Sequence, residues 1–136
     1  MNTNSYFSHP ERAPYQLGHL LKLMPADFSM RNPPTPEDRL IVEAAREHAI
    51  NANETLMNGL EALGHIISYA GDNENCNGDQ FVSLGALITH IAVESQFLQE
   101  TEWLIRETLE AHDEITAAKA AKSTGKRVVT RTEVPA

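Results

Sequence analysis

The sequence predicts an all-α protein built on one long antiparallel helical hairpin, preceded by a short helix. Two stretches of roughly 35 and 40 residues repeat apolar side chains at three- and four-residue intervals, which is the spacing of one helix face. The nine residues between them, 71–79, include no aliphatic or aromatic side chain. Two helices with matching apolar stripes and a short connection fold back on one another, so we expect the two stretches to pair.

Residues 1–35 are expected to form a flexible segment that holds one short helix over residues 15–24. The apolar positions of this helix follow the i, i+3, i+4, i+7 spacing: Leu17, Leu20, Leu21 and Met24. Pro25 ends the helix, because proline lacks the backbone N–H that a helix interior uses. Four of the seven prolines lie in residues 25–36, which therefore predict irregular structure.

A helical hairpin domain is expected over residues 36–119, with its first helix over 36–70. Thr35 is a good N-cap, Pro36 suits the first helical position, and Gly71 is a natural stop. The predicted buried stripe comprises Ile41, Ala45, Ala49, Ala52, Leu56, Leu60, Leu63, Ile67 and Ala70. At a rise of about 1.5 Å per residue, this helix would be about 50 Å long.

The second helix is expected to begin near Gln80 and to end at about Lys119. Its main predicted stripe comprises Phe81, Leu84, Ile88, Ile91, Ser95, Leu98, Ile105 and Leu109. Residues 120–136 are basic and show no apolar periodicity. They therefore predict a disordered basic tail.

The second helix also carries a second apolar set, nearly opposite Ile88 and Ile91. Its members are Ala86, Val93, Phe97 and Leu104. A helix that is apolar on two sides needs two partners. The N-terminal helix could cover this set within one chain, or a second copy could cover it and form a four-helix bundle, and we expect the homodimer. The residues expected to bind a partner are Val93, Phe97, Glu100, Trp103, Leu104 and Glu107.

The formal net charge of −8 is unevenly distributed along the chain. Residues 37–114 hold 16 acidic and three basic residues, a net charge of −13, whereas residues 115–136 hold one acidic and five basic residues, a net charge of +4. Nucleic acid and anionic membranes repel an acidic surface, so neither is an expected partner.

Three further features predict a cytoplasmic protein. Cys76 is the only cysteine, so no intramolecular disulfide can form. The first residues have neither the basic nor the apolar region of a secretory signal. No apolar run approaches the roughly 18 residues that a membrane span needs.

No catalytic residue, metal site or cofactor is expected. Glu61 with His65, and His90 with Glu94, are spaced four residues apart and could each touch a metal, but no third ligand is evident. The loop from Asn73 resembles the start of a calcium loop, yet its twelfth position is a leucine where a calcium loop has glutamate. The acidic neighbours of Cys76 disfavour a reactive thiolate.

Three stretches resemble small helical accessory proteins of bacterial prophages and other mobile elements. They are PTPEDRLIVEAAREH, LMNGLEALGHIISYAG and LGALITHIAVESQFL, which lie within residues 33–110. The resemblance implies a role during establishment of a phage or plasmid, exerted by binding a host protein. It assigns no function to particular residues.

The sequence therefore predicts a non-enzymatic protein–protein interaction module. In its sharper form, the acidic rod binds a basic host protein and inhibits a host nucleic-acid-processing complex. One alternative is a self-associating structural or assembly protein that uses the Val93–Leu104 face. The other is a weak nucleic-acid binder that uses the bases of the C-terminal tail: Lys119, Lys122, Lys126, Arg127 and Arg131.

Overall fold

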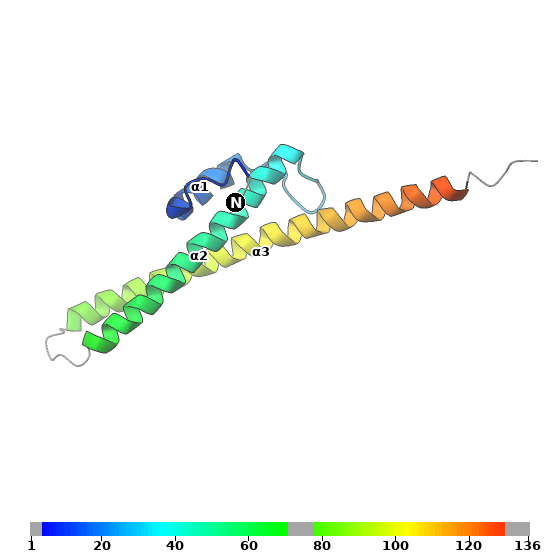
Figure 1. Cartoon of the computed structure of the whole chain (residues 1–136). Coiled ribbons are helices and arrows are strands. Elements are labelled where there is room, and N and C mark those ends of the chain that lie inside the picture. Colours follow the sequence, from blue (N-terminus) through cyan, green and yellow to red (C-terminus); the bar gives the residue numbers. More distant parts are fainter. Residues whose placement is uncertain (1–3, 71–77, 130–136) are drawn as a thin grey trace, which may run out of the picture.

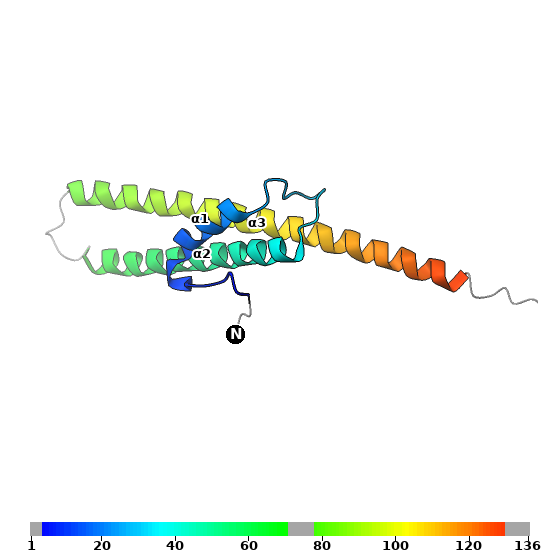
Figure 2. The same ribbon diagram turned by 90° about the horizontal axis from the view of Figure 1, so that it is seen from above.

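The computed structural model describes residues 4–70 and 78–129, with side chains described as far as Ser123. These residues form one turn of 3-10 helix, η1 (Pro10–Arg12), and three α-helices: α1 (Ala13–Leu23), α2 (Pro36–Ala70) and α3 (Gly78–Val129). The described part of the chain contains no strand, and the all-α prediction is confirmed. Helices α2 and α3 lie side by side and antiparallel, as Figures 1 and 2 show.

A capping box fixes the start of α2. The amide of Asp38 donates to Thr35 Oγ1 at 3.2 Å, and the amide of Thr35 donates to Asp38 Oδ2 at 3.2 Å. Each side chain thus satisfies a backbone donor that the first turn leaves unpaired. Thr35 is therefore the N-cap, as its position before Pro36 predicts.

The core is thick at one end of the hairpin and thin at the other. We call residues 36–52 of α2 and 98–114 of α3 the proximal half, and residues 53–70 and 78–97 the distal half. The proximal half contributes the buried residues Ile41, Val42, Ala44, Ala45, Ala49, Ala52, Leu98, Ile105 and Leu109. In the distal half Ser95 of the predicted stripes is buried, Phe81 is 52% exposed, and these residues are only half-buried: Leu56, Leu60, Leu63, Ile67, Leu84, Ile88 and Ile91. Two helices alone cannot remove both stripes from water.

The N-terminal segment, residues 4–35, accounts for this difference, and we call it the head. It folds across one side of the proximal half, where α1 packs against α2 (Figure 1). Ala13, Leu17 and Leu20 of α1 are buried. The head is thus packed structure where the sequence predicts a flexible segment, and its helix spans 13–23 where 15–24 is predicted.

Hydrogen bonds also join the head to the side of α2 on which α1 packs. Asn51 donates from Nδ2 to the carbonyl of Pro10 at 2.7 Å, and Asn4 donates to the carbonyl of Leu40 at 2.8 Å. These polar side chains lie beside the apolar contacts, and the spacing of apolar residues does not predict polar contacts of this kind. The sequence therefore predicts α1 but not its docking position.

Helix α3 continues well past the body of the protein. Asp113 near the end of the body pairs with Arg39 of α2, and the side chains from Glu114 to Ser123 are exposed. We call residues 114–129 the overhang (Figure 2). Alanine and lysine are good helix formers, which accounts for helix beyond the predicted end at Lys119. Residues 120–129 are helical where a disordered tail is predicted, and 130–136 lie outside the described residues.

Helix α3 is also long and apolar enough to cross a membrane by length and composition alone. An 18-residue window within residues 78–123 has a mean hydropathy of 1.4, and 11% of it is buried. The expectation that no apolar run approaches this length is therefore wrong in these terms. The apolar residues of α3 fall on two sides: one packs against α2, and the other is exposed.

Candidate interaction surface

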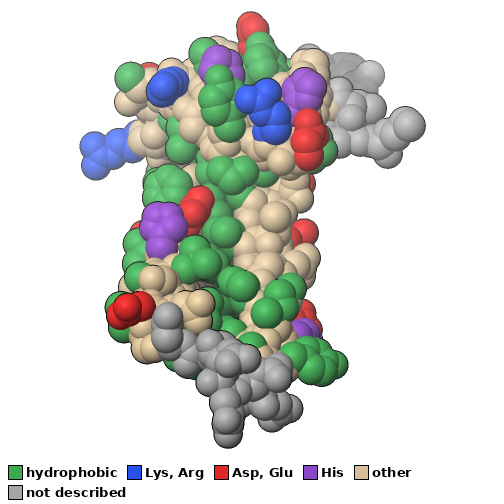
Figure 3. All heavy atoms as spheres, turned by 90° about the vertical axis from the view of Figure 1, so that its left-hand side faces the viewer, with side chains coloured by type: hydrophobic (Ala, Val, Ile, Leu, Met, Phe, Trp, Pro, Cys, Tyr) green, Lys and Arg blue, Asp and Glu red, His purple; other side chains and the backbone are tan. Residues whose placement is uncertain are grey.

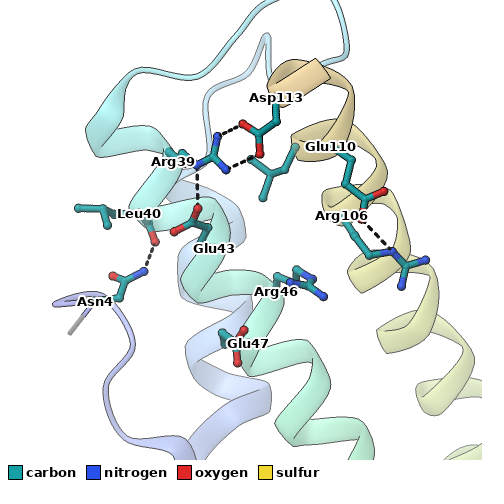
Figure 4. A pocket seen from close by; sticks show the side chains of 10 residues that line it. Asn4, Arg39, Leu40, Glu43, Arg46, Glu47, Arg106, Glu110 and Asp113 are labelled. Carbon is teal, nitrogen blue, oxygen red and sulfur yellow. Dashed lines mark hydrogen bonds and ion pairs between the residues drawn. The ribbon is translucent and has the colours of Figure 1, made fainter. Parts of the chain in front are cut away.

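A hollow lined mainly by charged side chains lies between the proximal ends of α2 and α3 (Figure 4). It has a volume of about 400 Å³ and is lined by Asn4, Arg39, Leu40, Glu43, Arg46, Glu47, Arg106, Leu109, Glu110 and Asp113. Arg39 donates to both carboxylate oxygens of Asp113, at 2.6 and 2.9 Å, and to Glu43 at 2.8 Å. These bonds raise the pKa of Arg39 and lower that of Asp113.

The other two arginines of this hollow share one carboxylate. Arg46 Nε donates to Glu102 Oε1 at 2.8 Å, and Arg106 Nη1 donates to Glu102 Oε2 at 3.3 Å. The guanidinium groups of Arg39, Arg46 and Arg106 are therefore all committed to carboxylates of the same chain. The ion pairs around the hollow hold α2 against α3. None of these three guanidinium groups is left unpaired for an anionic ligand.

His48 is a functional candidate that the apolar pattern did not single out. Its side chain is fully buried, and neither ring nitrogen has a hydrogen-bond partner among the described residues. The ring lies 4.6 Å from that of Phe7, between the head and α2. Burial lowers the pKa of His48, because the low-dielectric surroundings disfavour the imidazolium. Its four-residue spacing from Ala44 is the sequence signal that α2 buries a second side.

The histidine–carboxylate pairs are found where their spacing predicts, on the surface. His65 Nε2 lies 3.9 Å from Glu61, and His90 Nε2 lies 3.8 Å from Glu94. Within residues 4–70 and 78–129, no three metal-ligating side chains group together. Cys76 and the asparagine loop that begins at Asn73 lie outside the described residues.

Several large apolar side chains are exposed on the distal half. On α2, Ala62, Ile66 and Tyr69 continue the stripe of Ala44 and His48, because the steps between them are multiples of about 3.6 residues. The head buries Ala44 and His48 but leaves the rest uncovered: Ile66 is 62% exposed and Tyr69 is 79% exposed. The apolar side of α2 thus extends beyond the head.

Helix α3 contributes to the same side of the hairpin. The head contacts α3 at His112, whose ring nitrogen lies 2.8 Å from the carbonyl of Ser29. Phe97 lies 15 residues before His112, a little over four helical turns, and is therefore about 60° round the helix from it, with Val93 a further 40° round. Val93 and Phe97 are 62% and 52% exposed. We call Ala62, Ile66, Tyr69, Leu87, Val93 and Phe97 the open face.

Figure 3 looks at the molecule from the hairpin tip, with hydrophobic side chains between the tip and the head and histidine and acidic side chains among them. An apolar groove of about 160 Å³ also lies between the distal ends of the two helices. It is lined by Leu63, Ile66, Ile67, Ala70, Gln80, Phe81 and Leu84. The exposed apolar surface is therefore continuous with a groove that ends at the tip.

The residues predicted to bind a partner do not all lie on one side. Val93, Phe97 and Leu104 are exposed on the side of α3 away from its buried stripe, and the head does not cover them. Trp103 is 52% exposed but lies about 100° round the helix from Leu104, so it points to another side. Glu100 is exposed and Glu107 half-buried. The sequence missed the α2 contribution, Ile66 and Tyr69, because it assigned α2 a single stripe.

Comparisons of the chain with protein-family models, with curated proteins and with solved structures give no match.

Proposed function

We propose that this protein is a non-enzymatic protein–protein interaction module that associates through the open face, with a four-helix bundle of two hairpins as the assembled form. The observation that supports the proposal is the uncovered apolar side of the distal half, where Ile66, Tyr69, Val93 and Phe97 are each more than half exposed. Large apolar side chains left exposed on a protein surface are typical of interaction sites where they gather, because water disfavours them.

Burial of the exposed apolar side chains would favour association. Complete burial of one large apolar side chain contributes about 1.5–3 kcal/mol, and the open face offers several such side chains. A hairpin is two helices wide, and a second hairpin is the simplest partner that covers both helices at once. The arginines of the charged hollow hold α2 against α3, so we interpret the hollow as a structural contact within the hairpin.

Sedimentation equilibrium over a range of concentrations tests the proposal. We expect the wild-type chain to sediment as a dimer, and the double variant Ile66→Asp with Phe97→Asp to sediment as a monomer. Ile115→Asp is the matched control: Ile115 is 46% exposed but lies on the overhang, so this variant should remain a dimer. Far-ultraviolet circular dichroism checks that each variant keeps its helices.

A wild-type chain that sediments as a monomer at every accessible concentration would contradict the proposed self-association. Loss of the dimer in the control as well would show that the open face is not the contact.

A further inference from the structure

We infer that mild acid opens the head on a hinge: protonation of His48 releases residues 4–23 from α2, while His112 keeps Ser29 anchored to α3. The inference goes beyond the proposed function, since it concerns the head and holds whatever binds at the open face. Three features carry it: a buried imidazole with no hydrogen-bond partner among the described residues, a second buried imidazole that has one, and a non-helical link between the parts of the head that cover them.

His48 lies where an added proton has no acceptor. Its side chain is fully buried beneath the head, and both ring nitrogens lack a hydrogen-bond partner within the described part of the chain. The ring of Phe7 lies against it, with the two ring centroids 4.6 Å apart. An imidazolium donates from both nitrogens, and burial of a charged donor without an acceptor is strongly unfavourable. A proton on His48 therefore favours a form in which the head has left α2 and water reaches the ring.

No charged group compensates for that proton. Burial alone lowers the pKa of His48. Tyr6 of the head donates to Glu37 at 2.9 Å, and His9 lies 3.1 Å from Glu11, so these groups are engaged with one another. Among the described residues, the other ionisable groups on the elements around this site form no hydrogen bond or ion pair with His48: Arg12, Tyr15, His19, Lys22, Glu43, Glu47 and Glu102.

The second histidine buried beneath the head responds to acid in the opposite way. His112 of α3 is 4% exposed, and its Nε2 lies 2.8 Å from the carbonyl oxygen of Ser29. Only a nitrogen that carries a hydrogen can bond to a carbonyl, so a further proton adds to Nδ1 and leaves this bond intact. The carboxylate of Asp113 also lies close enough for His112 to contribute to its lowered pKa. Acid therefore preserves the contact at Ser29 while it weakens the contact at His48.

The two contacts belong to parts of the head that can move separately. Helix α1 ends at Leu23, and Met24 is extended, with φ −60° and ψ 142°. Pro25 follows and prevents the helix from continuing toward Ser29. The chain then runs as a loop from α1 to the start of α2 (Figure 1). Residues 24–28 therefore form the hinge, with α1 on one side of it and the anchored Ser29 on the other.

The open form exposes apolar surface that the closed form buries. The hydrogen bonds that hold residues 4–23, such as that from Asn51 to Pro10, are exposed, so water replaces them at little cost. Leu17 and Ala44 lose their cover. An 11-residue helix is also marginal in water by itself, so α1 unfolds when it leaves α2. Acid thereby controls how much apolar surface the chain presents.

Hydrogen exchange with mass spectrometry at pH ~7.5 and pH ~5, corrected for intrinsic exchange rates, tests the opening. At pH ~5 the protection of residues 13–23 should fall by up to about 30-fold, the gain that an exposed histidine with a pKa of about 6.5 allows. Residues 41–52 should remain protected. His48→Leu should keep α1 protected at both pH values, and His48→Met repeats the test with a more flexible apolar side chain. His19→Leu, at an exposed position, should follow wild type.

Two pairs of spin labels test the hinge, with Cys76→Ser as the background. His19→Cys with Asn58→Cys reports on α1 against α2. Met30→Cys with Thr116→Cys reports on the anchored part of the head against α3. All four positions are exposed, so the labels do not disturb the core. At pH ~5 we expect the first separation to lengthen and the second to stay unchanged.

The outcomes distinguish hinged opening from the alternatives. In a His48→Leu background neither separation should change with pH. An increase in both separations would show that the whole head detaches, and would overturn the hinge. Unchanged protection of residues 13–23 at pH ~5, or an equal loss of protection in His48→Leu, would overturn the role of His48. Loss of protection confined to chains that contain His48, with a fixed second separation, would support the inference.

Discussion

Arg39 and Asp113 are 74 residues apart in sequence and form a two-point ion pair, with both carboxylate oxygens accepting from the guanidinium at 2.6 and 2.9 Å. The pair closes the end of the hairpin at the point where α3 leaves the body. Because the guanidinium geometry matches the carboxylate, this contact fixes the relative register of the two helices as well as their proximity.

Loss of this ion pair is expected to lower stability in a pH-dependent way. Hydrogen bonds from Arg39 lower the pKa of Asp113, so the folded state holds the carboxylate more firmly than the unfolded state does. Its contribution is present above the ordinary aspartate pKa of about 4 and is lost as the pH falls through the lowered folded value. Thermal unfolding of wild type and Asp113→Asn should differ at pH 7, and the difference should shrink below pH ~4. A constant difference across this range would contradict the prediction.

His48 should make the docking of the head sensitive to mild acid. Its folded pKa is lowered by burial, so stability is full above the unfolded histidine pKa of about 6.5 and falls as the pH drops below it. We expect His48→Leu to lose less stability than wild type between pH 7.5 and pH ~5, measured by thermal unfolding. His19→Leu, at an exposed position on α1, is the control and should follow wild type.

Truncation of Leu17 should destabilise the head. Leu17 is 2% exposed, and large-to-small changes at buried leucines cost about 2–5 kcal/mol. Chemical denaturation of Leu17→Ala should show a loss in this range, and limited proteolysis should cut the head faster. Leu23→Ala is a matched control, because Leu23 lies on the same helix and is 45% exposed. Equal losses in the two variants would rule out the observed docking of α1.

Amide hydrogen exchange should distinguish the two halves of the hairpin. The proximal half is buried within one chain, so the protection of residues 41–52 should not depend on concentration. In the proposed dimer a second copy covers the distal half, so the protection of residues 57–69 should rise with concentration. Concentration-independent exchange in both segments would argue against association through the distal half.

The sequence allows prediction of the helices more fully than of their packing. The three- and four-residue spacing, with Thr35 and Pro36 at its start, predicts α2 correctly, since capping and periodicity are local properties. The docking of the head could not be predicted, because it depends on contacts between distant residues such as Phe7 with His48. Only the four-residue step from Ala44 to His48 indicates the second side of α2.

The open face could be predicted in part. Val93 and Phe97 stand out because they are large and lie opposite the main stripe of α3. Ile66 and Tyr69 do not stand out, because the predicted buried stripe beside them already explains the apolar residues of α2. Their exposure also depends on where along α2 the head ends. The end of α3 is harder still, since alanine- and lysine-rich sequence is compatible with both helix and coil in the absence of tertiary contacts.

The unbroken course of α3 has a mechanical consequence. The helix is 52 residues long, which at about 1.5 Å per residue is close to 78 Å. A stiff helix of this length works as a lever: a tilt of a few degrees at the tip displaces the opposite end by several ångströms. Any event that tilts α3 at the hairpin tip would therefore be transmitted to the lysine-bearing end of the molecule.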